Sequence, residues 1–378
     1  MQIAFFSNFL NHHQLPLCQE FFKLTNGNFT FVATEPIPEE RLKLGYYDMN
    51  KEYDFVLTTY DNAANEDKAM DLALNSDVII IGSAPEKYVL ERIKRKRITF
   101  RYSERLLKRG MIYAFSPRLI LYMLLHHTRF LNYPLYMLCA SSYTAKDYSY
   151  YGAYLNKAYK WGYFPVVNKY HIENLMKRKK GEYIRILWVA RFIPLKHPEV
   201  VIEVANYLRK QKYNFEISMI GTGPIEDDIK KLVEQKGLNN FIKFKGSMSP
   251  EKVRLFMEEA NIFLFTSDYN EGWGAVLNES MNSGCAVVAC KAIGSANFLI
   301  KDNYNGLLYD FGNQEQLNNL VEKLILDTGL REKIGINAYK TIVEEWSPES
   351  AAIRFIELTN KLMQGKDVHY ETGPCSKA

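Results

Sequence analysis

Short apolar runs alternate with amphipathic stretches of helical length along the second half of the chain. The expected strands are residues 184–190, 215–220, 241–245, 262–266 and 286–289. The helices expected between them are residues 197–210, 224–235, 250–259 and 274–283. This spacing predicts parallel β-α-β units in a doubly wound sheet. Because such sheets bind ligands at the carboxyl ends of their strands, candidate residues should lie in the loops there.

The first half has a similar pattern with less regular spacing. Its expected strands are residues 2–6, 29–32, 55–58, 78–81, 98–101 and 136–140, with helical stretches between several of them. A length of 378 residues fits two domains better than one. The sequence therefore predicts an α/β protein with two Rossmann-like, doubly wound domains.

Changes in composition suggest where these domains begin and end. We expect an N-terminal domain at 1–165, a linker at 166–182 containing a basic cluster, and a C-terminal domain at 183–346. A last amphipathic helix, opened by Pro348, should occupy 347–365. The polar residues 366–378 are expected to form a mobile tail.

The cysteines and the first residues give information on the cellular compartment of the protein. The five cysteines are scattered and form no CxxC pair, so neither a disulfide framework nor a zinc site is indicated. The first residues lack a basic leader before an apolar run, so they are interpreted as a strand and not a signal peptide. A cytoplasmic location is expected, with a peripheral position on the inner membrane face as a further hypothesis.

Charge is distributed unevenly. Residues 1–182 contain 25 Lys and Arg against 18 Asp and Glu, whereas residues 183–378 contain 23 against 25. Segment 87–109 alone has ten basic and two acidic residues, and the apolar segment 110–139 follows it. Polar residues interrupt that segment too often for it to span a bilayer. Segment 87–139 is either an interfacial patch that meets anionic lipids or a core helix beside a solvated basic face. No nucleic-acid-binding module is recognisable.

The strongest candidate site follows the strand at 262–266. Its loop contains Glu271, Gly272, Trp273 and Gly274, and Glu279 lies in the helix expected next. Glycines at this turn let a ligand approach the backbone, and the helix N-terminus favours an anion such as a diphosphate. The two glutamates can accept hydrogen bonds from ligand hydroxyls. Ordinary surface glutamates at a helix start are the alternative.

Two further loops follow neighbouring expected strands. Arg191 and Lys196 flank the loop after 184–190, where both cations could hold phosphate oxygens. Gly221 and Gly223 follow 215–220 and either admit a ligand or merely form a tight turn.

In this order and at these spacings, the three loops resemble the C-terminal domain of retaining GT-B glycosyltransferases of family 4, over residues 184–346. The Glu-x7-Glu motif of Glu271 and Glu279 is the specific part, and Trp273 replaces the more usual Phe. The resemblance implies two domains facing a central cleft. It also implies catalytic roles for Glu271, Arg191 and Lys196, with Glu279, residues 272–274 and the glycine loop binding the donor. The final helix would return to the first domain.

The N-terminal half offers fewer candidates. Asn11, His12 and His13 follow the first expected strand, where the family commonly has a glycine-rich loop near donor and acceptor. They either serve the acceptor side or merely start a helix.

The resemblance implies a retaining hexosyltransferase of polysaccharide or glycoconjugate biosynthesis. It would move a sugar from a nucleotide-diphosphate donor to a glycan or lipid-linked acceptor. No cofactor and no metal are expected, since no Asp-x-Asp occurs and two cations can neutralise the leaving diphosphate. The alternatives are a GT-B epimerase or phosphorylase, or an inactive glycosyltransferase-like subunit that binds a partner or membrane.

Overall fold

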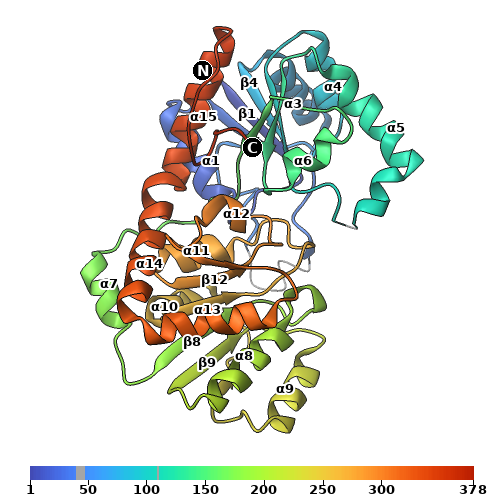
Figure 1. Cartoon of the computed structure of the whole chain (residues 1–378). Coiled ribbons are helices and arrows are strands. Elements are labelled where there is room, and N and C mark those ends of the chain that lie inside the picture. The colour runs from blue at the N-terminus through green and yellow to red at the C-terminus, as the bar shows by residue number, and fades with distance from the viewer. Residues whose placement is uncertain (40–46, 109) are drawn as a thin grey trace. The chain divides into compact units, whose positions relative to one another are not determined.

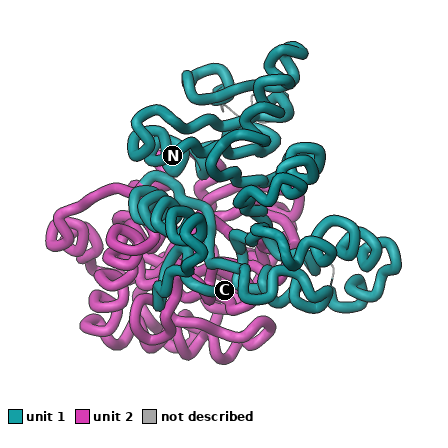
Figure 2. Tube along the Cα trace, turned by 90° about the horizontal axis from the view of Figure 1, so that it is seen from above, with its two compact units in different colours: residues 1–166, 347–378 teal, residues 167–346 magenta. Residues whose placement is uncertain are grey.

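The chain forms two compact units, each built on one parallel sheet. A computed structural model describes residues 1–39, 47–108 and 110–378. Unit 1 comprises Met1–Val166 and Ser347–Ala378, and unit 2 comprises Val167–Trp346 (Figure 2). Both sheets pair their named strands in parallel, and among the described residues helices connect most consecutive strands. These observations confirm the predicted fold class of two Rossmann-like α/β domains.

The described part of unit 1 contains a seven-stranded sheet in the order β3-β2-β1-β4-β5-β6-β7. Its strands are β1 Ile3–Ser7, β2 Phe29–Ala33, β3 Val56–Thr58, β4 Val78–Ile81, β5 Thr99–Ser103, β6 Leu135–Cys139 and β7 Ala158–Lys160. Its helices are α1 Leu15–Leu24, α3 Ala63–Asn75, α4 Lys87–Lys94, α5 Pro117–His126, α6 Thr144–Ser149 and α15 Pro348–Met363, with the 3₁₀ turns η1 Met111–Phe115 and η2 Thr128–Phe130 (Figure 1). The six expected strands are confirmed within two residues, but β7 was not expected.

Helix α15 completes the core of unit 1 although it follows unit 2 in the sequence. It lies beside α1 (Figure 1). The buried ring of Phe355 in α15 packs 5.4 Å from Phe21 of α1, 4.9 Å from Phe100 of β5 and 5.7 Å from Trp161, measured between ring centroids. Aromatic packing of this kind fixes the C-terminal helix on the first unit.

The last residues differ from the mobile tail expected at 366–378. The Ser376 carbonyl accepts a hydrogen bond from the Lys160 N–H at 2.7 Å, and the Cys375 N–H donates to the Lys160 carbonyl at 2.8 Å. Cys375 and Ser376 are buried. Residues 374–378 therefore extend the pairing of β7, and composition alone missed this because a polar segment can still satisfy its backbone on a sheet edge.

Unit 2, all of which is described, contains a six-stranded sheet in the order β10-β9-β8-β11-β12-β13. Its strands are β8 Ile184–Val189, β9 Phe215–Ile220, β10 Ile242–Phe244, β11 Ile262–Phe265, β12 Ala286–Cys290 and β13 Leu307–Tyr309. Its helices are α7 Ile172–Arg178, α8 Pro198–Lys210, α9 Glu226–Gln235, α10 Pro250–Glu259, α11 Val276–Asn282, α12 Ala296–Leu299, α13 Gln314–Leu326 and α14 Thr328–Lys340, with the 3₁₀ turn η3 Pro194–Lys196 and the π-helical turn η4 Thr341–Glu345. The five expected strands are confirmed, and β13 was not expected.

Part of the expected linker 166–182 is structured. Helix α7 lies within it, and Lys179 directly after α7 is buried. The Lys179 ammonium donates to the carbonyls of Met257 at 3.0 Å and Ala260 at 2.7 Å, at the C-terminal end of α10. The expected linker therefore contributes to the packing of unit 2.

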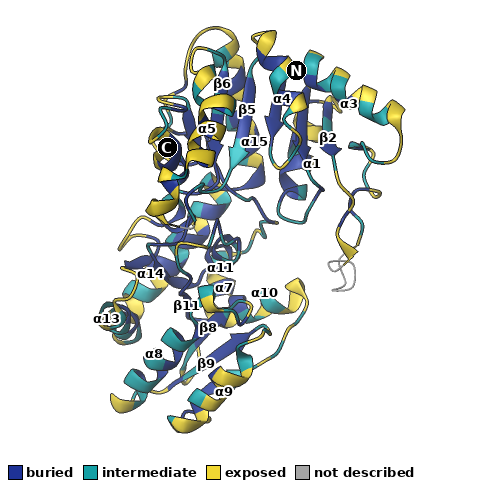
Figure 3. Cartoon of the chain, turned by 90° about the vertical axis from the view of Figure 1, so that its right-hand side faces the viewer, coloured by how far each residue is buried: buried dark blue, intermediate teal, exposed yellow. Residues whose placement is uncertain are grey.

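The strand order of unit 2 reverses between β8 and β11. Chain connections from β8 run first to β9 and β10 on one side, and then return to β11, β12 and β13 on the other. These strands are buried (Figure 3). In doubly wound sheets the loops that diverge at such a reversal leave a crevice for ligands at the carboxyl edge. The loops after β8 and β11 are the two that flank it.

Segment 87–139 is described except for Arg109, which lies outside the described residues. No helix within the described part of the chain is long and apolar enough to cross a bilayer.

Candidate active site

Two loops at the carboxyl edge of the unit 2 sheet bring Lys196 and Glu271 together. Lys196 ends the turn η3 after β8, and Glu271 lies in the loop after β11. Their side chains form an ion pair, with only 15% and 13% of each side chain exposed. The two residues lie 75 positions apart in the sequence, so the sheet reversal is what makes them neighbours. A cation and a carboxylate thus share the crevice in which this fold binds ligands.

Buried hydrogen bonds hold the Lys196 loop against the strand that carries Glu271. The Thr266 hydroxyl at the end of β11 donates to the Lys196 carbonyl at 2.6 Å. It accepts a hydrogen bond at 3.0 Å from the indole N–H of Trp188 in β8. Farther along, the Asp268 N–H donates to the Leu195 carbonyl at 3.0 Å. These contacts fix the backbone from which both charged side chains extend.

His197 ties the same two loops together and was missed in the sequence as a site residue. Its Nδ1 lies 2.7 Å from a carboxylate oxygen of Glu199, and its Nε2 lies 3.2 Å from one of Asp268. The hydrogen bond with Glu199 raises the pKa of His197 above its ordinary value, while burial opposes this and Asp268 adds to it. Both ring nitrogens then donate, which favours the imidazolium. The sequence signal that could have identified His197 was its position directly before Pro198, at the start of an expected helix.

Arg191 and Glu279 are placed differently from the central pair. Arg191 follows β8 with an exposed side chain that forms no ion pair within the described residues. Glu279 lies in α11, and burial raises its pKa while the nearby Arg254 opposes that rise. Arg254 donates to the Glu279 carbonyl at 2.9 Å. Arg191 is therefore available to an incoming anion, and Glu279 is a half-buried acceptor for a polar ligand group.

Gly221 and Gly223 allow the loop after β9 to touch the loop after β8. A Cβ on Gly221 would lie 1.9 Å from the Ala190 carbonyl oxygen, and one on Gly223 would lie 2.3 Å from that of Phe192. Because real Cβ atoms do not approach an oxygen so closely, both positions require glycine. Loop packing alone accounts for these glycines, which is the tight-turn alternative raised by the sequence.

The turn at 272–274 is also shaped by packing. Gly274 has a φ of 78°, and a Cβ there would lie 2.3 Å from the Phe265 ring. Gly272 is buried, and the Trp273 indole is enclosed between Trp346 and Phe298, 5.9 and 6.4 Å away by ring centroids. The side chain of Trp273 thus belongs to the core, and its carbonyl accepts a hydrogen bond from the Ser295 hydroxyl.

Helix α11 begins later than expected. It covers Val276–Asn282, whereas the sequence predicted residues 274–283. The positive φ of Gly274 is incompatible with a helix at that position. A seven-residue helix offers a weak dipole, so charge at this site comes mainly from Arg191 and Lys196. Within the described residues, no three His, Cys, Asp or Glu side chains converge as a metal ion would require.

The N-terminal candidates lie together in the loop after β1 of unit 1. The Asn11 side-chain oxygen accepts from the N–H groups of His13 at 3.0 Å and Gln14 at 3.2 Å, which shapes the start of α1. The rings of His12 and His13 lie 3.7 Å apart, and His13 stacks on Tyr163 at 5.8 Å. Asn11 is thus engaged in the turn itself.

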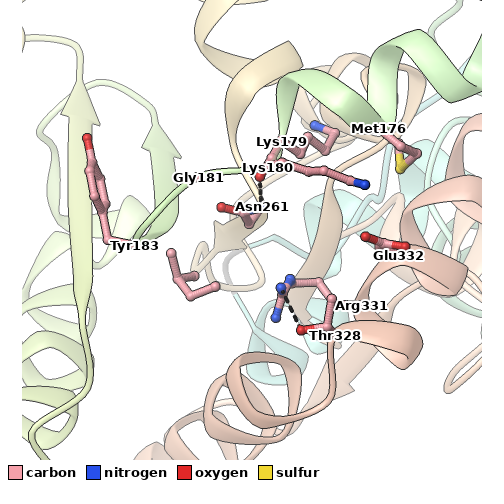
Figure 4. Close-up of a pocket in the computed structure, with 11 residues that line it drawn as sticks. Met176, Lys179, Lys180, Gly181, Tyr183, Asn261, Thr328, Arg331 and Glu332 are labelled. Atoms are coloured by element: carbon pink, nitrogen blue, oxygen red, sulfur yellow. Dashed lines mark hydrogen bonds between the residues drawn. The ribbon is translucent and has the colours of Figure 1, made fainter.

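A cavity of about 350 Å³ lies at the other edge of the unit 2 sheet (Figure 4). Its walls include Ile184 at the start of β8, and Asn261 and Gly284, which come just before β11 and β12. Lys180 and Glu332 also line it. Because it lies at the amino ends of the strands, this cavity is separate from the ion pair of Lys196 and Glu271.

Two parallel Rossmann-like sheets, with charged loops at the reversal of the second, define an α/β protein of the GT-B class. Residues 173–341 match the family model described as "Glycosyl transferases group 1". Unit 2 therefore carries a glycosyl transferases group 1 domain.

Similar proteins of known name match part of this chain. A poly(ribitol-phosphate) alpha-N-acetylglucosaminyltransferase of Staphylococcus aureus is 29% identical over 198 residues, which are 52% of this chain and 39% of that protein. The lipopolysaccharide core biosynthesis glycosyltransferase LpsE of Rhizobium meliloti is 25% identical over 173 residues, 46% of this chain and 48% of that protein. The chain thus spans less than half the length of these relatives.

Solved structures match almost the whole chain at low identity. Anabaena Alr3699/HepE in complex with UDP superposes with a TM-score of 0.68 at 17% identity, covering 94% of this chain and 99% of that one. Sucrose-phosphate synthase from Thermosynechococcus elongatus gives 0.64 at 14% identity, covering 97% and 100%. These similarities establish the fold of both units.

Proposed function

We propose that this protein is a glycosyltransferase that moves a sugar from a nucleotide-diphosphate donor to a glycan or lipid-linked acceptor. The ion pair of Lys196 with Glu271 at the sheet reversal of unit 2 is the observation that carries the proposal. A cation that can bind phosphate then lies beside a carboxylate that can hold sugar hydroxyls, so the diphosphate and the sugar of one donor would be bound side by side. The group 1 domain match over 173–341 supports the same activity.

Each proposed residue has a chemical task. Lys196 and the exposed Arg191 bind the diphosphate and neutralise the charge that develops as it leaves. Glu271 accepts hydrogen bonds from donor-sugar hydroxyls, and the backbone at 272–274 approaches the sugar and phosphate. Glu279 accepts hydrogen bonds from the ribose hydroxyls, which suits a carboxylate whose pKa is raised by burial. Two cations make the transfer independent of a metal, and we propose retention at the anomeric carbon.

The donor and acceptor classes follow from relatives. Alr3699/HepE is described with UDP and with UDP-glucose, so UDP-sugars are the first donors to test. One relative is named for poly(ribitol-phosphate) and another for lipopolysaccharide core biosynthesis, so surface glycans are the first acceptors. On the acceptor side we retain His12 and His13 as proton-transfer or hydroxyl-binding candidates.

The proposal is tested by a donor screen followed by transfer assays. Thermal shift against UDP-, GDP- and ADP-sugars should select one nucleotide, since a ligand that binds the folded state raises the melting temperature. Nucleoside diphosphate should then be released only when an acceptor glycan is present. Adding EDTA, which removes divalent metal ions, should leave this release unchanged. Product NMR should report the donor's anomeric configuration.

Matched variants locate the chemistry. Lys196→Ala and Glu271→Ala should each abolish transfer while the protein stays folded, whereas Lys231→Ala, on the exposed face of α9, should keep full activity. Full activity in both site variants would refute the assignment.

Two alternative functions are separated by the same assays. A GT-B epimerase would convert the sugar nucleotide without an acceptor glycan, whereas a phosphorylase would release sugar 1-phosphate from a glycan supplied with inorganic phosphate. An inactive subunit would neither bind a sugar nucleotide nor release its diphosphate.

A further inference from the structure

Unit 1 exposes an apolar surface on η1, α5 and Leu131, which we call the α5 surface. Its side chains are unusually open to water: Ile112 is 90% exposed, Phe115 76% and Leu121 57%. Leu124 and Leu125 add to it on the last turn of α5. Helix α5 is correspondingly exposed along much of its length (Figure 3). An exposed apolar surface of this extent is typical of a site that binds a membrane or another protein.

The sequence of α5 differs from that of an ordinary surface helix. Apolar residues occupy all sides of Pro117–His126, yet only Leu119 and Met123, one turn apart, are buried against the unit. A helix at the surface of a soluble domain normally has one apolar stripe and a polar remainder. A helix that is apolar all round is normally enclosed by protein or by lipid.

Hydrogen bonds fix the α5 surface in this outward position. The Tyr151 hydroxyl donates to the Ala114 carbonyl in η1 at 2.9 Å. At the other end, the Thr128 hydroxyl donates to the Tyr151 carbonyl at 2.7 Å, and the buried His127 ring lies 2.7 Å from the Tyr154 hydroxyl. Because hydrogen bonds join both ends to segment 151–154, the fold itself holds the apolar side chains facing outward.

The chain around the α5 surface is predominantly basic, although Arg105 and Lys108 pair with Asp147 and Glu104, and Glu86 lies 3.6 Å from His126. Residues 105–146 contain six Lys and Arg and no Asp or Glu. Within the surface itself, Arg118 and Arg129 are exposed. Two copies of this chain that met through the same face would bring these cations together, which opposes association. An anionic partner complements both the charge and the apolar area.

We propose that the α5 surface docks on an anionic membrane. Helix α5 would lie in the plane of the interface, with Ile112, Phe115 and Leu121 among the acyl chains and the two arginines at the headgroups. Ten residues of α5 are too few to span a bilayer. This binding needs neither donor nor acceptor, so it can be tested separately from the proposed transfer activity.

The apolar part of the proposal is tested by vesicle cosedimentation of the full chain. The protein should pellet with phosphatidylglycerol vesicles, and the Ile112→Ser/Phe115→Ser variant should bind at least about tenfold more weakly. The matched control is Leu255→Ser/Leu326→Ser, which changes two exposed leucines of unit 2, 56% and 68% exposed, and should bind as the parent does. All these side chains are exposed, so the variants should keep the parent's circular dichroism and melting temperature.

The contribution of charge is tested by comparing phosphatidylglycerol with phosphatidylcholine vesicles and the parent with the Arg118→Gln/Arg129→Gln variant. At roughly 1 kcal/mol for each cation at an anionic surface, each arginine accounts for about a fivefold change in affinity. The double variant should therefore bind about 25-fold more weakly to phosphatidylglycerol, and phosphatidylcholine should bind the parent poorly. Equal binding by the serine variant and its control would overturn the proposal. So would a parent protein that binds neither phosphatidylglycerol nor phosphatidylcholine vesicles. A concentration-dependent dimer lost in the serine variant, without vesicle binding, would identify a second copy as the occupant.

Discussion

Replacing Glu271 by Gln should strengthen nucleoside diphosphate binding while it abolishes sugar transfer. Gln keeps the size and a hydrogen-bond acceptor of Glu271 but removes the charge that pairs with Lys196. In the unliganded protein this carboxylate competes with phosphate for the ammonium. Without it, Lys196 is free to bind the diphosphate, whereas the sugar hydroxyls lose an anionic acceptor.

The size of the effect follows from the ion pair. Two unit charges within 4 Å attract by about 4 kcal/mol at an effective dielectric constant near 20. Solvation of the freed ammonium and the surviving hydrogen bond offset much of this attraction, and about 1.4 kcal/mol should remain. That energy corresponds to roughly tenfold tighter diphosphate binding. Transfer should fall by about a hundredfold or more, because the lost contact acts on the reacting sugar.

Titration calorimetry with the nucleoside diphosphate selected by the donor screen measures this change. Lys196→Met should weaken the same binding by about tenfold or more, so the two variants move the affinity in opposite directions. Glu234→Gln, on an exposed position of α9, is the charge-matched control and should leave the affinity unchanged. If Glu271→Gln weakens diphosphate binding as Lys196→Met does, the two side chains do not compete as described.

Three further predictions concern stability. His197 has a raised pKa, so its charged form stabilises the fold below about pH 6.5, and this contribution is lost as pH rises through the folded pKa. The stability difference between the parent and His197→Gln should therefore shrink from pH 6 to pH 8.5 in urea titrations, and a gap that widens would contradict the assignment. Gly223→Ala should lower the free energy of unfolding by about 2 kcal/mol or more, whereas Gly329→Ala, with room for its Cβ near the start of α14, should be neutral or slightly stabilising. Deleting residues 374–378 should cost about 3 kcal/mol through lost edge hydrogen bonds and burial, and an unchanged denaturation midpoint would show that this segment adds nothing.

The sequence predicted the elements whose pattern is local. The strands β1 to β6 and β8 to β12 stand out because apolar runs of four or more residues, or turn residues around them, mark them. The three-residue strand β7 carries no such signal, whereas β13 is marked by Asn305, Gly306 and Asp310 around its apolar residues and was overlooked.

The candidate site shows the same limit. Glu271, Lys196 and Arg191 could be selected because each follows a predicted strand, and parallel strands end at one edge. The ion pair itself could not be predicted, nor the link from His197 to Asp268, because both join residues more than 70 positions apart. Trp273 was selected for its motif, whereas its ring proved to be enclosed by Trp346, a contact that only the folded chain reveals.

The return of α15 to unit 1 has a consequence for biosynthesis. On the ribosome, residues 1–166 emerge before unit 2, but the helix that covers Phe21, Phe100 and Trp161 is made only after all of unit 2. Unit 2 is continuous and can fold as soon as it emerges, whereas unit 1 must wait with part of its aromatic core uncovered. A helix translated after unit 2 thus completes unit 1, and the aromatic core of unit 1 stays open to chaperones and to aggregation until Phe355 appears.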